Sequence, residues 1–259
     1  MPLSSKRKLT AESSGFGSPV ERIFAILNLT AEQGMIATAD VVRALDIPRA
    51  TAHRLVTNLE AFGLLRQTPF KGKYGAAPKL ITFATSLFAS NSVYLPIKTL
   101  LLALTRRTGE SHSINIYSNG EVEYFDGTDI SSSVWQLRTG HKSPLHCTGA
   151  GQVFLAGFDD ENLDRFLQTG PWEQVTPNTL TTRESLYERV MQVRKQGYTI
   201  ADSEYTEGII IGSVPIKNKA GKVVAALGMR VTKLSYNISK VAELIPTMQA
   251  YANRIGKLL

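Results

Sequence analysis

The densest set of hydrogen-bonding side chains lies between positions 49 and 58. The residues that we expect to face a partner there are Arg49, Ala50, Thr51, His53, Arg54, Thr57 and Asn58. On the opposite side an apolar stripe runs at helical spacing from Ala52 to Phe62. A helix divided in this way can rest on a scaffold and offer donors to DNA, although a lone helix could equally turn its polar side to water. Arg49 and Arg54 can each donate two hydrogen bonds to guanine, and the later side chains more readily meet phosphate.

A second candidate site is the glycine-rich stretch Thr148–Gly151, which precedes an apolar helical pattern. Free backbone N–H groups at a helix start form a site for an anion. We expect Gly149 and Ala150 to present these groups, although close packing of the helix would also explain the glycines. Arg230 ends an otherwise apolar strand, where a buried guanidinium would need a carboxylate or similar partner. Strand alternation could equally turn Arg230 outward.

A third cluster consists of His141, His146 and Cys147. It resembles half of a metal site, and Cys147 beside a helix start could be a reactive thiol, but the spacing matches no strong zinc pattern. Glu204 and Glu207 could act as an acid/base pair, but their spacing on a loop fixes no geometry. The sequence contains no Gly-x-Ser-x-Gly, His-Glu-x-x-His or phosphate-loop motif. We therefore expect no catalytic residue, no metal and no cofactor, and a metal or redox sensor or an enzyme stays as the alternative.

The elements that must hold residues 49–58 are three predicted helices. Ser18–Glu21 is a capping box that starts the first helix, and Gly34 ends it. Thr38 is suited to cap the second helix. Pro48 opens the third helix, and Gly63 stands just after its end.

A predicted β-hairpin follows these helices. Its strands are Leu64–Gln67 and Lys73–Ala76, and the connecting Thr-Pro-Phe-Lys-Gly is typical of a hairpin turn. Lys71 and Lys73 lie at its tip, where lysine neutralises phosphate charge without reading sequence. Three helices followed by a hairpin predict a winged helix-turn-helix over residues 18–77 that binds a double-stranded DNA operator.

The rest of the chain changes character. Residues 78–91 read as a helical linker, and residues 92–259 as one α+β domain with a mostly antiparallel sheet. Alternating patterns occur at 114–124, 134–138, 198–201, 209–216 and 223–231. Helical patterns occur at 95–104, 149–157, 160–168, 182–196 and 239–258, with a further capping box at 181–184. Residues 1–17 are rich in Ser, Gly and charge and read as a disordered arm.

The composition agrees with a basic reader of nucleic acid joined to a nearly neutral partner domain. The net charge is +7, and residues 1–77 hold 10 Lys or Arg against 6 Asp or Glu, which leaves 19 against 16 for the remainder. The single cysteine, Cys147, excludes an intramolecular disulfide and fits a reducing compartment. No apolar run approaches the roughly 18 residues of a membrane span, and no signal peptide is evident. We therefore expect a cytoplasmic protein without a membrane partner.

Three motifs in this order resemble the IclR family of bacterial transcriptional regulators. They are IPRATAHRLVTNLEAFGLL, SPLHCTGAGQVFLAG and GYTIADSEYTEGIIIGSVPIKNKAGKVVAALGM. The resemblance covers nearly the whole chain from about residue 18 and implies a winged helix-turn-helix joined by a helix to a GAF-like α+β effector-binding domain. It also implies dimers, often paired into tetramers, and repression or activation controlled by a metabolite.

The resemblance further implies an effector pocket. In the family the segment at Gly149 and Ala150 supplies backbone donors to a carboxylate, and Asp202 corresponds to an acidic position of the pocket. Ile211 stands where some relatives have a pocket cysteine. Gly228 and Arg230 stand near serines of some relatives, so the ligand is expected to differ from the smallest keto acids.

Trp135 lies in the segment that forms the hydrophobic side of that pocket in the family. A tryptophan there suits an aromatic or larger apolar body, although Trp135 could equally belong to the core. We therefore expect the effector to be a small organic acid, with an aromatic carboxylate as one option.

Overall fold

The computed structural model describes residues 18–90, 93–130 and 139–259. The chain divides into two compact units, Met1–Asn91 and Ser92–Leu259. The expected arm at 1–17, the expected strand at 134–138 and Trp135 lie outside the described residues.

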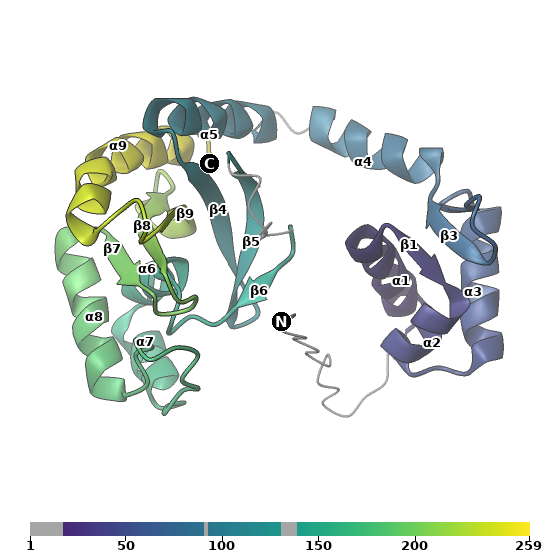
Figure 1. Ribbon diagram of the computed structural model, residues 1–259, viewed down its shortest axis with the longest axis horizontal. Coiled ribbons are helices and arrows are strands. Elements are labelled where there is room, and N and C mark those ends of the chain that lie inside the picture. The colour runs from purple at the N-terminus through teal and green to yellow at the C-terminus, as the bar shows by residue number, and fades with distance from the viewer. Residues whose placement is uncertain (1–17, 91–92, 131–138) are drawn as a thin grey trace. The chain divides into compact units, whose positions relative to one another are not determined.

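The N-terminal unit packs helices against a small antiparallel sheet of order β1-β3-β2 (Figure 1). Its elements are α1 (Pro19–Gln33), β1 (Met35–Ala37), α2 (Thr38–Leu45), α3 (Arg49–Ala61), β2 (Leu65–Gln67), β3 (Lys73–Ala76) and α4 (Pro78–Ser90). The predicted capping box is present, since the Ser18 hydroxyl accepts from the Glu21 N–H at 3.2 Å and the Glu21 carboxylate accepts from the Ser18 N–H at 3.0 Å. Gly34 ends α1 with φ +74°. The predicted winged helix-turn-helix order is therefore confirmed.

Two local predictions are wrong in this unit, and one strand was not predicted. Residues 35–37 form that strand, β1, which pairs with β3; three residues are too few to show alternation. Ala37, not Thr38, occupies the N-cap position of α2, and its N–H donates to the Asp40 carboxylate at 2.7 Å. Phe62 lies beyond the end of α3 and is 68% exposed, so it does not continue the apolar stripe.

The C-terminal unit contains a six-stranded antiparallel sheet of order β6-β5-β4-β9-β8-β7. Its strands are β4 (Ser111–Ser118), β5 (Glu121–Thr128), β6 (Lys142–Ser143), β7 (Thr199–Asp202), β8 (Ile209–Lys217) and β9 (Val223–Thr232). Its helices are α5 (Tyr94–Thr108), α6 (Gly149–Gly157), α7 (Asp160–Leu167), α8 (Arg183–Gln196) and α9 (Ile238–Gly256). The expected capping box at 181–184 is wrong, because Thr182 is the N-cap of α8 and its hydroxyl accepts from the Ser185 N–H at 3.2 Å.

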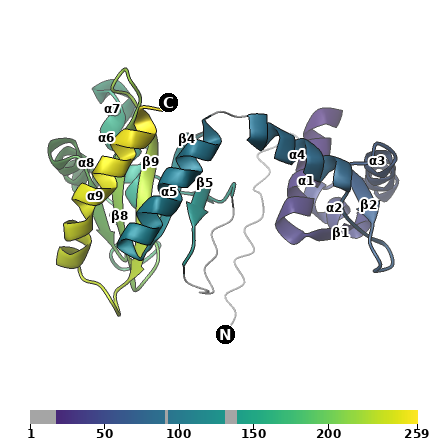
Figure 2. The same cartoon turned by 90° about the horizontal axis from the view of Figure 1, so that it is seen from above.

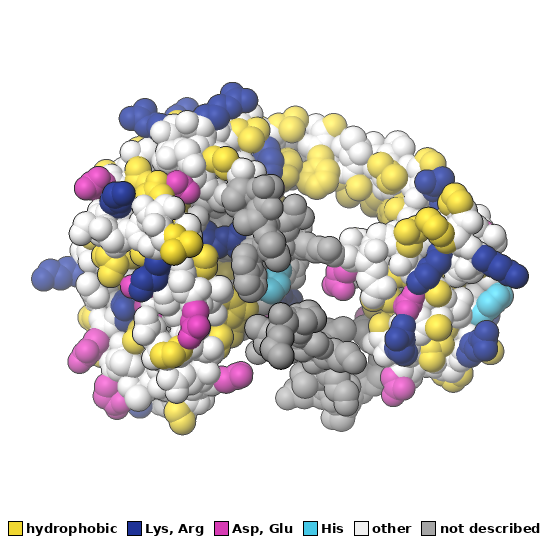
Figure 3. Space-filling view, in the orientation of Figure 1, with side chains coloured by type: hydrophobic (Ala, Val, Ile, Leu, Met, Phe, Trp, Pro, Cys, Tyr) yellow, Lys and Arg dark blue, Asp and Glu magenta, His cyan; other side chains and the backbone are white. Residues whose placement is uncertain are grey.

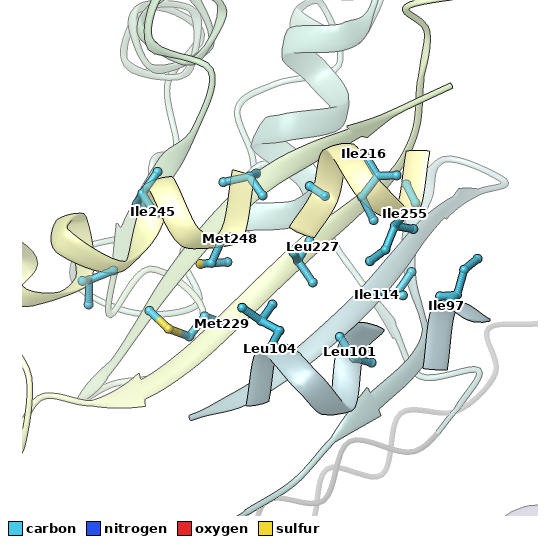
Figure 4. Packing of buried hydrophobic residues seen from close by; sticks show 14 of the residues in the cluster. Ile97, Leu101, Leu104, Ile114, Ile216, Leu227, Met229, Ile245, Met248 and Ile255 are labelled. Atoms are coloured by element: carbon cyan, nitrogen blue, oxygen red, sulfur yellow. The ribbon is translucent and has the colours of Figure 1, made fainter. Parts of the chain in front are cut away.

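The two faces of this sheet carry different helices. Helices α5 and α9 lie side by side over one face, and α6 packs on the other face with α8 beside it (Figure 2). The α5/α9 face is closed by aliphatic and methionine side chains, among them Leu101, Leu104, Leu227, Met229 and Met248 (Figure 4). A second apolar cluster, which includes Val153, Phe154 and Leu186, fills the α6 side.

Strand alternation assigns the side chains of β8 and β9 to these faces. Met229 belongs to the α5/α9 cluster, and a Cβ built on Gly212 would meet Val241 and Ile245 of α9. Ile211, Ser213 and Gly228 alternate with Gly212 and Met229 along the two strands, so they face α6. Ile211 pairs directly with Arg230 in the register of the two strands, so Arg230 also points to the α6 face.

No single helix among the described residues is long and apolar enough to cross a membrane.

Candidate DNA-reading helix and effector site

Helix α3 separates its side chains as the sequence predicts. Ala52, Leu55, Val56 and Leu59 are buried in the N-terminal core. Of the predicted contact residues, Thr51 is half-buried and the others are exposed; these are Arg49, Ala50, His53, Arg54, Thr57 and Asn58. Figure 3 shows Lys, Arg and His side chains on the side of this unit where α3 lies. A row of exposed donors on a helix held by its other face is the arrangement that major-groove reading requires.

The two predicted wing lysines differ. Lys71 is exposed in the turn between β2 and β3. Lys73 instead forms a 3.3 Å ion pair with Asp40 of α2, which also pairs with Arg43. The hydrogen bond from the Ala37 N–H and these cations hold the pKa of the Asp40 carboxyl below its usual range. Of the two lysines, Lys71 is the one whose ammonium group is available to a phosphate.

The start of α6 lies against β8. Thr148 caps the helix by accepting from the Gly151 N–H at 3.2 Å, and among the described residues no hydrogen bond engages the N–H groups of Gly149 and Ala150. A Cβ built on Gly149 would lie 2.6 Å from the Ser213 hydroxyl and 3.1 Å from a methyl of Ile211. Glycine is therefore required there for close packing, as well as being compatible with the predicted anion site.

Ser213 is a candidate site residue that the sequence patterns did not identify. Its side chain is fully buried, and its hydroxyl has no hydrogen-bond partner among the described residues. An orphaned buried hydroxyl costs free energy, so this side chain beside the helix-start amides is a candidate for binding a ligand group. The signal in the sequence was one polar residue two positions after Ile211, in a strand that is otherwise apolar.

Gly228 lies directly opposite Ser213 on β9. A Cβ built on Gly228 would lie 2.9 Å from the Ser113 hydroxyl of β4 and 3.7 Å from the Ser213 hydroxyl. The absence of a side chain therefore keeps the space between these two hydroxyls clear. Gly149, Ile211 and Gly228, predicted separately, come together around Ser213.

Arg230 lines a cavity of about 300 Å³ between β4, β5 and β9. Other residues that line it are Ser111, Ser113, Tyr124, Asp129 and Thr139. Gly149, Ala150 and Gly228 do not line this cavity. Arg230 is thus the predicted effector residue that the cavity includes, and Ser113 connects it to the Gly228 space.

Tyr124 lies over Gly127 on β5. A Cβ on Gly127 would fall 2.0 Å from the Tyr124 hydroxyl, so only glycine lets the ring lie there. Burial, together with the neighbouring Asp126 charge, raises the pKa of Tyr124 to about 12. The phenol therefore keeps its proton at neutral pH and can donate into the cavity.

Asp202 lies in a different environment from the other predicted effector residues. Its carboxylate pairs with Lys233 at 2.9 Å and accepts from the Ser203 hydroxyl at 2.8 Å. Partial burial alone would raise its pKa, but the bonds from Lys233 and Ser203 outweigh it and leave the pKa below its usual range. These contacts order the end of β7.

Glu204 is part of a buried network and does not form a pair with the exposed Glu207. Its carboxylate accepts from Arg189 of α8 and from the Gln152 amide of α6, both at 2.6 Å. The Gln152 carbonyl oxygen accepts from the Thr199 hydroxyl at 2.7 Å. Burial raises the pKa of Glu204 against the opposing effect of Arg189. The network ties α6 to α8 and β7 and accounts for Glu204 as a structural residue.

His146 and Cys147 are also held by packing. The His146 ring stacks on Trp172 at 5.7 Å between centroids and contacts the Glu173 carbonyl oxygen at 3.1 Å. Burial lowers the pKa of His146, and Cys147 is fully buried. Within the part of the chain that the structure describes, no group of three or more His, Cys, Asp or Glu side chains is placed to hold a metal ion.

Family models match both units of the chain. The IclR helix-turn-helix domain matches residues 19–69, and the C-terminal domain of the bacterial transcriptional regulator IclR matches residues 89–257. The chain belongs to the IclR family. The family consists of transcriptional regulators with a DNA-binding helix-turn-helix domain and a C-terminal effector-binding domain, so the resemblance and the predicted fold class are confirmed.

Individual IclR relatives agree with this assignment. The HTH-type transcriptional regulator XynR of Escherichia coli is 30% identical over 212 residues, which span 81% of this chain and 84% of XynR. The crystal structure of an IclR transcriptional regulator from Alicyclobacillus acidocaldarius superposes with a TM-score of 0.82 at 21% identity, over 92% of this chain and 97% of that one. The crystal structure of an IclR homologue from Microbacterium hydrocarbonoxydans in complex with 4-hydroxybenzoate superposes with a TM-score of 0.77 at 22% identity. The match covers 92% of this chain and 99% of that one.

Proposed function

We propose that this IclR-family regulator binds an organic acid at the start of α6 and that the acid changes its affinity for a DNA operator. The observation that carries the proposal is the buried, unpartnered Ser213 hydroxyl beside the N–H groups of Gly149 and Ala150. Amides at a helix start and a hydroxyl are suited to the two oxygens of a carboxylate. The 4-hydroxybenzoate bound to one solved relative also supports an organic acid.

The coupling to DNA is a linkage between two sites. An acid that prefers one arrangement of the two units shifts the population toward it and thereby changes how well α3 fits its half-site. Reciprocity requires operator DNA to change the affinity for the acid by the same factor.

The proposal is tested by comparing acids with their neutral amides and alcohols. Carboxylates should raise the melting temperature and the neutral analogues much less, because the site donates hydrogen bonds to negative charge. Ser213→Ala should weaken acid binding roughly 10- to 100-fold, since a hydrogen bond to a charged group contributes about 1.5–3 kcal/mol. Neutral compounds that outperform every carboxylate would contradict the anion site.

We also propose that Arg49 and Arg54 read the operator from the start and middle of α3, where both are exposed. Arg49→Ala and Arg54→Ala should each weaken operator binding by about 1–3 kcal/mol, with less loss on random DNA. An equal loss of affinity for operator and random DNA would indicate that these arginines contact phosphates. If neither substitution weakens binding to either DNA, α3 is not the reading helix.

Self-association is proposed through α4. Three of its large apolar side chains, Ile81, Phe83 and Leu87, are 55–59% exposed, and no residue of α4 is buried. An apolar helix without a covered face needs a partner, and a second copy would also place two reading helices on a two-fold operator. Sedimentation should show a dimer or tetramer; a single 28.4 kDa species at micromolar concentration, with and without DNA, would contradict this. Phe83→Glu should weaken the association.

A further inference from the structure

The wing of the N-terminal unit, formed by β2, β3 and the turn at 68–72, carries a phenylalanine at its tip. Phe70 is 62% exposed and does not belong to the apolar core of this unit. An exposed benzyl group gains little from burial, so packing of the fold does not account for it. Single exposed apolar side chains are common on protein surfaces, so what distinguishes Phe70 is how it is held and what surrounds it.

The turn that carries Phe70 is braced by hydrogen bonds. The Thr68 hydroxyl accepts from the Phe70 N–H at 3.3 Å and donates to the Lys73 carbonyl oxygen at 3.1 Å. The Phe70 carbonyl oxygen accepts from the Lys73 N–H at 3.0 Å. Gly72 closes the turn with φ +71°, a conformation that glycine adopts without strain. Because the backbone is already ordered, seating the ring against a partner costs little further conformational entropy.

The wing is also tied to the helices of its unit. Lys73 pairs with Ala37 of β1 through the backbone and with the Asp40 carboxylate of α2 through its ammonium group, at 3.3 Å. Strand β2 packs against α3, and its first residue, Leu65, is buried in the core. The wing and the proposed reading helix are therefore parts of one packed unit, which fixes where the tip stands beside α3.

The charge around the ring is of one sign. Residues 64–77 contain three cations, Arg66, Lys71 and Lys73, and no Asp or Glu. Lys73 is engaged by its ion pair, whereas Arg66 and Lys71, which precede and follow Phe70 in the chain, are exposed. An apolar ring between two exposed cations matches a partner with anionic edges and an apolar interior. DNA has this arrangement, because phosphates flank the stacked bases.

The width of the DNA grooves decides which groove the ring can enter. A reading helix fills the major groove, which is about 12 Å wide, whereas the adjacent minor groove is about 6 Å wide and too narrow for a helix. A single side chain on a hairpin turn is small enough for the minor groove. Phenylalanine is one of the side chains that minor-groove proteins insert between base pairs, which partly unstacks one step and kinks the duplex.

We propose that Phe70 is an apolar wedge that enters the minor groove beside the α3 half-site, partly unstacks one base step and bends the operator. Arg66 and Lys71 hold the phosphates on the two sides of that step. The inference rests on the proposed DNA-reading function and adds a second contact that depends on DNA shape. Pyrimidine–purine steps such as TA and CA unstack most readily, so the wedge selects sequence at a position that α3 does not contact.

The first test is selection of binding sequences from a random DNA library with the full-length protein and with Phe70→Ala. The wild-type protein should enrich a TA or CA step at a fixed distance from the half-site that α3 reads. Phe70→Ala should enrich the same half-site and lose the preference at the flanking step. This result would separate the contribution of the wing from that of the reading helix.

The second test measures the bend of the selected duplex by energy transfer between dyes at its two ends. The wild-type protein should bend the DNA by roughly 20–90°, the range that inserted side chains produce. Phe70→Ala should lose most of the bend and weaken operator binding about ten-fold, a change typical of losing one good contact. Phe70→Leu should keep most of the bend and of the affinity, because leucine also serves as a wedge.

Two further variants control for charge and for exposed aromatic surface. Lys71→Ala should lower the slope of log affinity against log salt by about one and leave the bend unchanged, because a lysine on a phosphate neutralises charge without unstacking bases. Phe62→Ala removes a ring of similar exposure in the same unit and should change neither the bend nor the affinity. Melting curves without DNA confirm that each variant is folded.

The contrary outcomes are separable. Straight DNA in the wild-type complex, or a bend that persists in Phe70→Ala or is lost equally in Phe62→Ala, would overturn the wedge. The reading role of α3 would stand if Arg49→Ala still weakened operator binding. Weakened self-association of Phe70→Ala without DNA, with an unchanged bend, would assign the ring to a second copy and also overturn the wedge. A library in which no sequence is enriched would overturn the DNA-reading proposal together with this inference.

Discussion

The two faces of the six-stranded sheet follow different rules of packing. On the α5/α9 face, Ile114, Leu227 and Met229 join helical side chains in a continuous apolar cluster. On the α6 face, the same strands turn Ser113 and Arg230 inward, and the apolar cluster occupies only part of the surface. Because successive side chains of a strand point to opposite faces of the sheet, the same strands produce both faces.

The difference separates stability from binding. Close packing of aliphatic side chains lowers the free energy of the folded state, whereas buried polar groups without partners raise it. Under the proposed function, a ligand and not the fold accounts for the residue type at Ser213. Substitutions on the two faces should accordingly have opposite effects on stability and on effector binding.

The largest expected loss of stability is on the packed face. Leu227→Ala removes a fully buried side chain from the α5/α9 cluster and should lower the free energy of unfolding by about 2–5 kcal/mol. Denaturant titration measures the loss. A change below about 1 kcal/mol would show that this face does not carry the stability of the unit.

The packed face also contains one buried histidine, His112. Its Nδ1 donates to the Glu110 carbonyl oxygen at 2.9 Å, its Nε2 has no partner among the described residues, and burial lowers its pKa to about 4. Because the unfolded chain binds a proton near pH 6.5 and the folded chain does not, stability is fully present above pH 6.5 and falls as the pH drops toward 4. The loss should reach up to about 3 kcal/mol.

Denaturant titrations between pH 7 and 4 test this expectation. The burial-lowered pKa of His146 adds a loss of the same sign. His112→Gln should therefore reduce the slope of stability against pH without abolishing it. A slope unchanged by this substitution would show that His112 does not carry the acid sensitivity.

Gly228→Ala tests the open space on the polar face. The added methyl would lie 2.9 Å from the Ser113 hydroxyl, which can rotate away, so the stability cost should be only about 1 kcal/mol. Acid binding should nevertheless fall at least ten-fold, because the methyl fills the path between Ser113 and Ser213. Undiminished binding of the acid would show that the ligand does not pass over Gly228.

The smallest expected stability change belongs to Ser213→Ala. The substitution removes a hydroxyl that has no partner, so the ligand-free protein should change by no more than about 0.5 kcal/mol or become more stable. A loss above about 1.5 kcal/mol would mean that Ser213 supports the fold, and the contrast between the two faces would not hold at this position.

The sequence correctly predicted those features of the fold that depend on residues close together in the chain. The capping box at Ser18, the division of α3 and the start of α6 at Gly149 depend on neighbours within one turn or one helix face. Ser213 could not be identified in this way, because its burial and lack of a partner depend on α6 packing against β8. Likewise, the direction of Arg230 was left open until the register with Ile211 and the helices on each face were known.

The partners of charged side chains were the least predictable. Lys73 was expected at the wing tip, and Asp202 in the effector pocket. Their ion pairs with Asp40 and Lys233 join residues that are 33 and 31 positions apart. Such pairs depend on how separate elements meet, which no local pattern encodes.

The central claim is that an acid bound beside Ser213 controls DNA affinity. A binding sequence selected from a random DNA library would be titrated with the protein, with and without a saturating carboxylate that raises the melting temperature, and the fluorescence anisotropy of the DNA recorded. We predict a change in operator affinity of roughly 5- to 150-fold, the usual range for allosteric coupling. The same carboxylate concentration should have little effect on the operator affinity of Ser213→Ala. An acid that binds the wild-type protein but leaves its operator affinity unchanged would contradict the account.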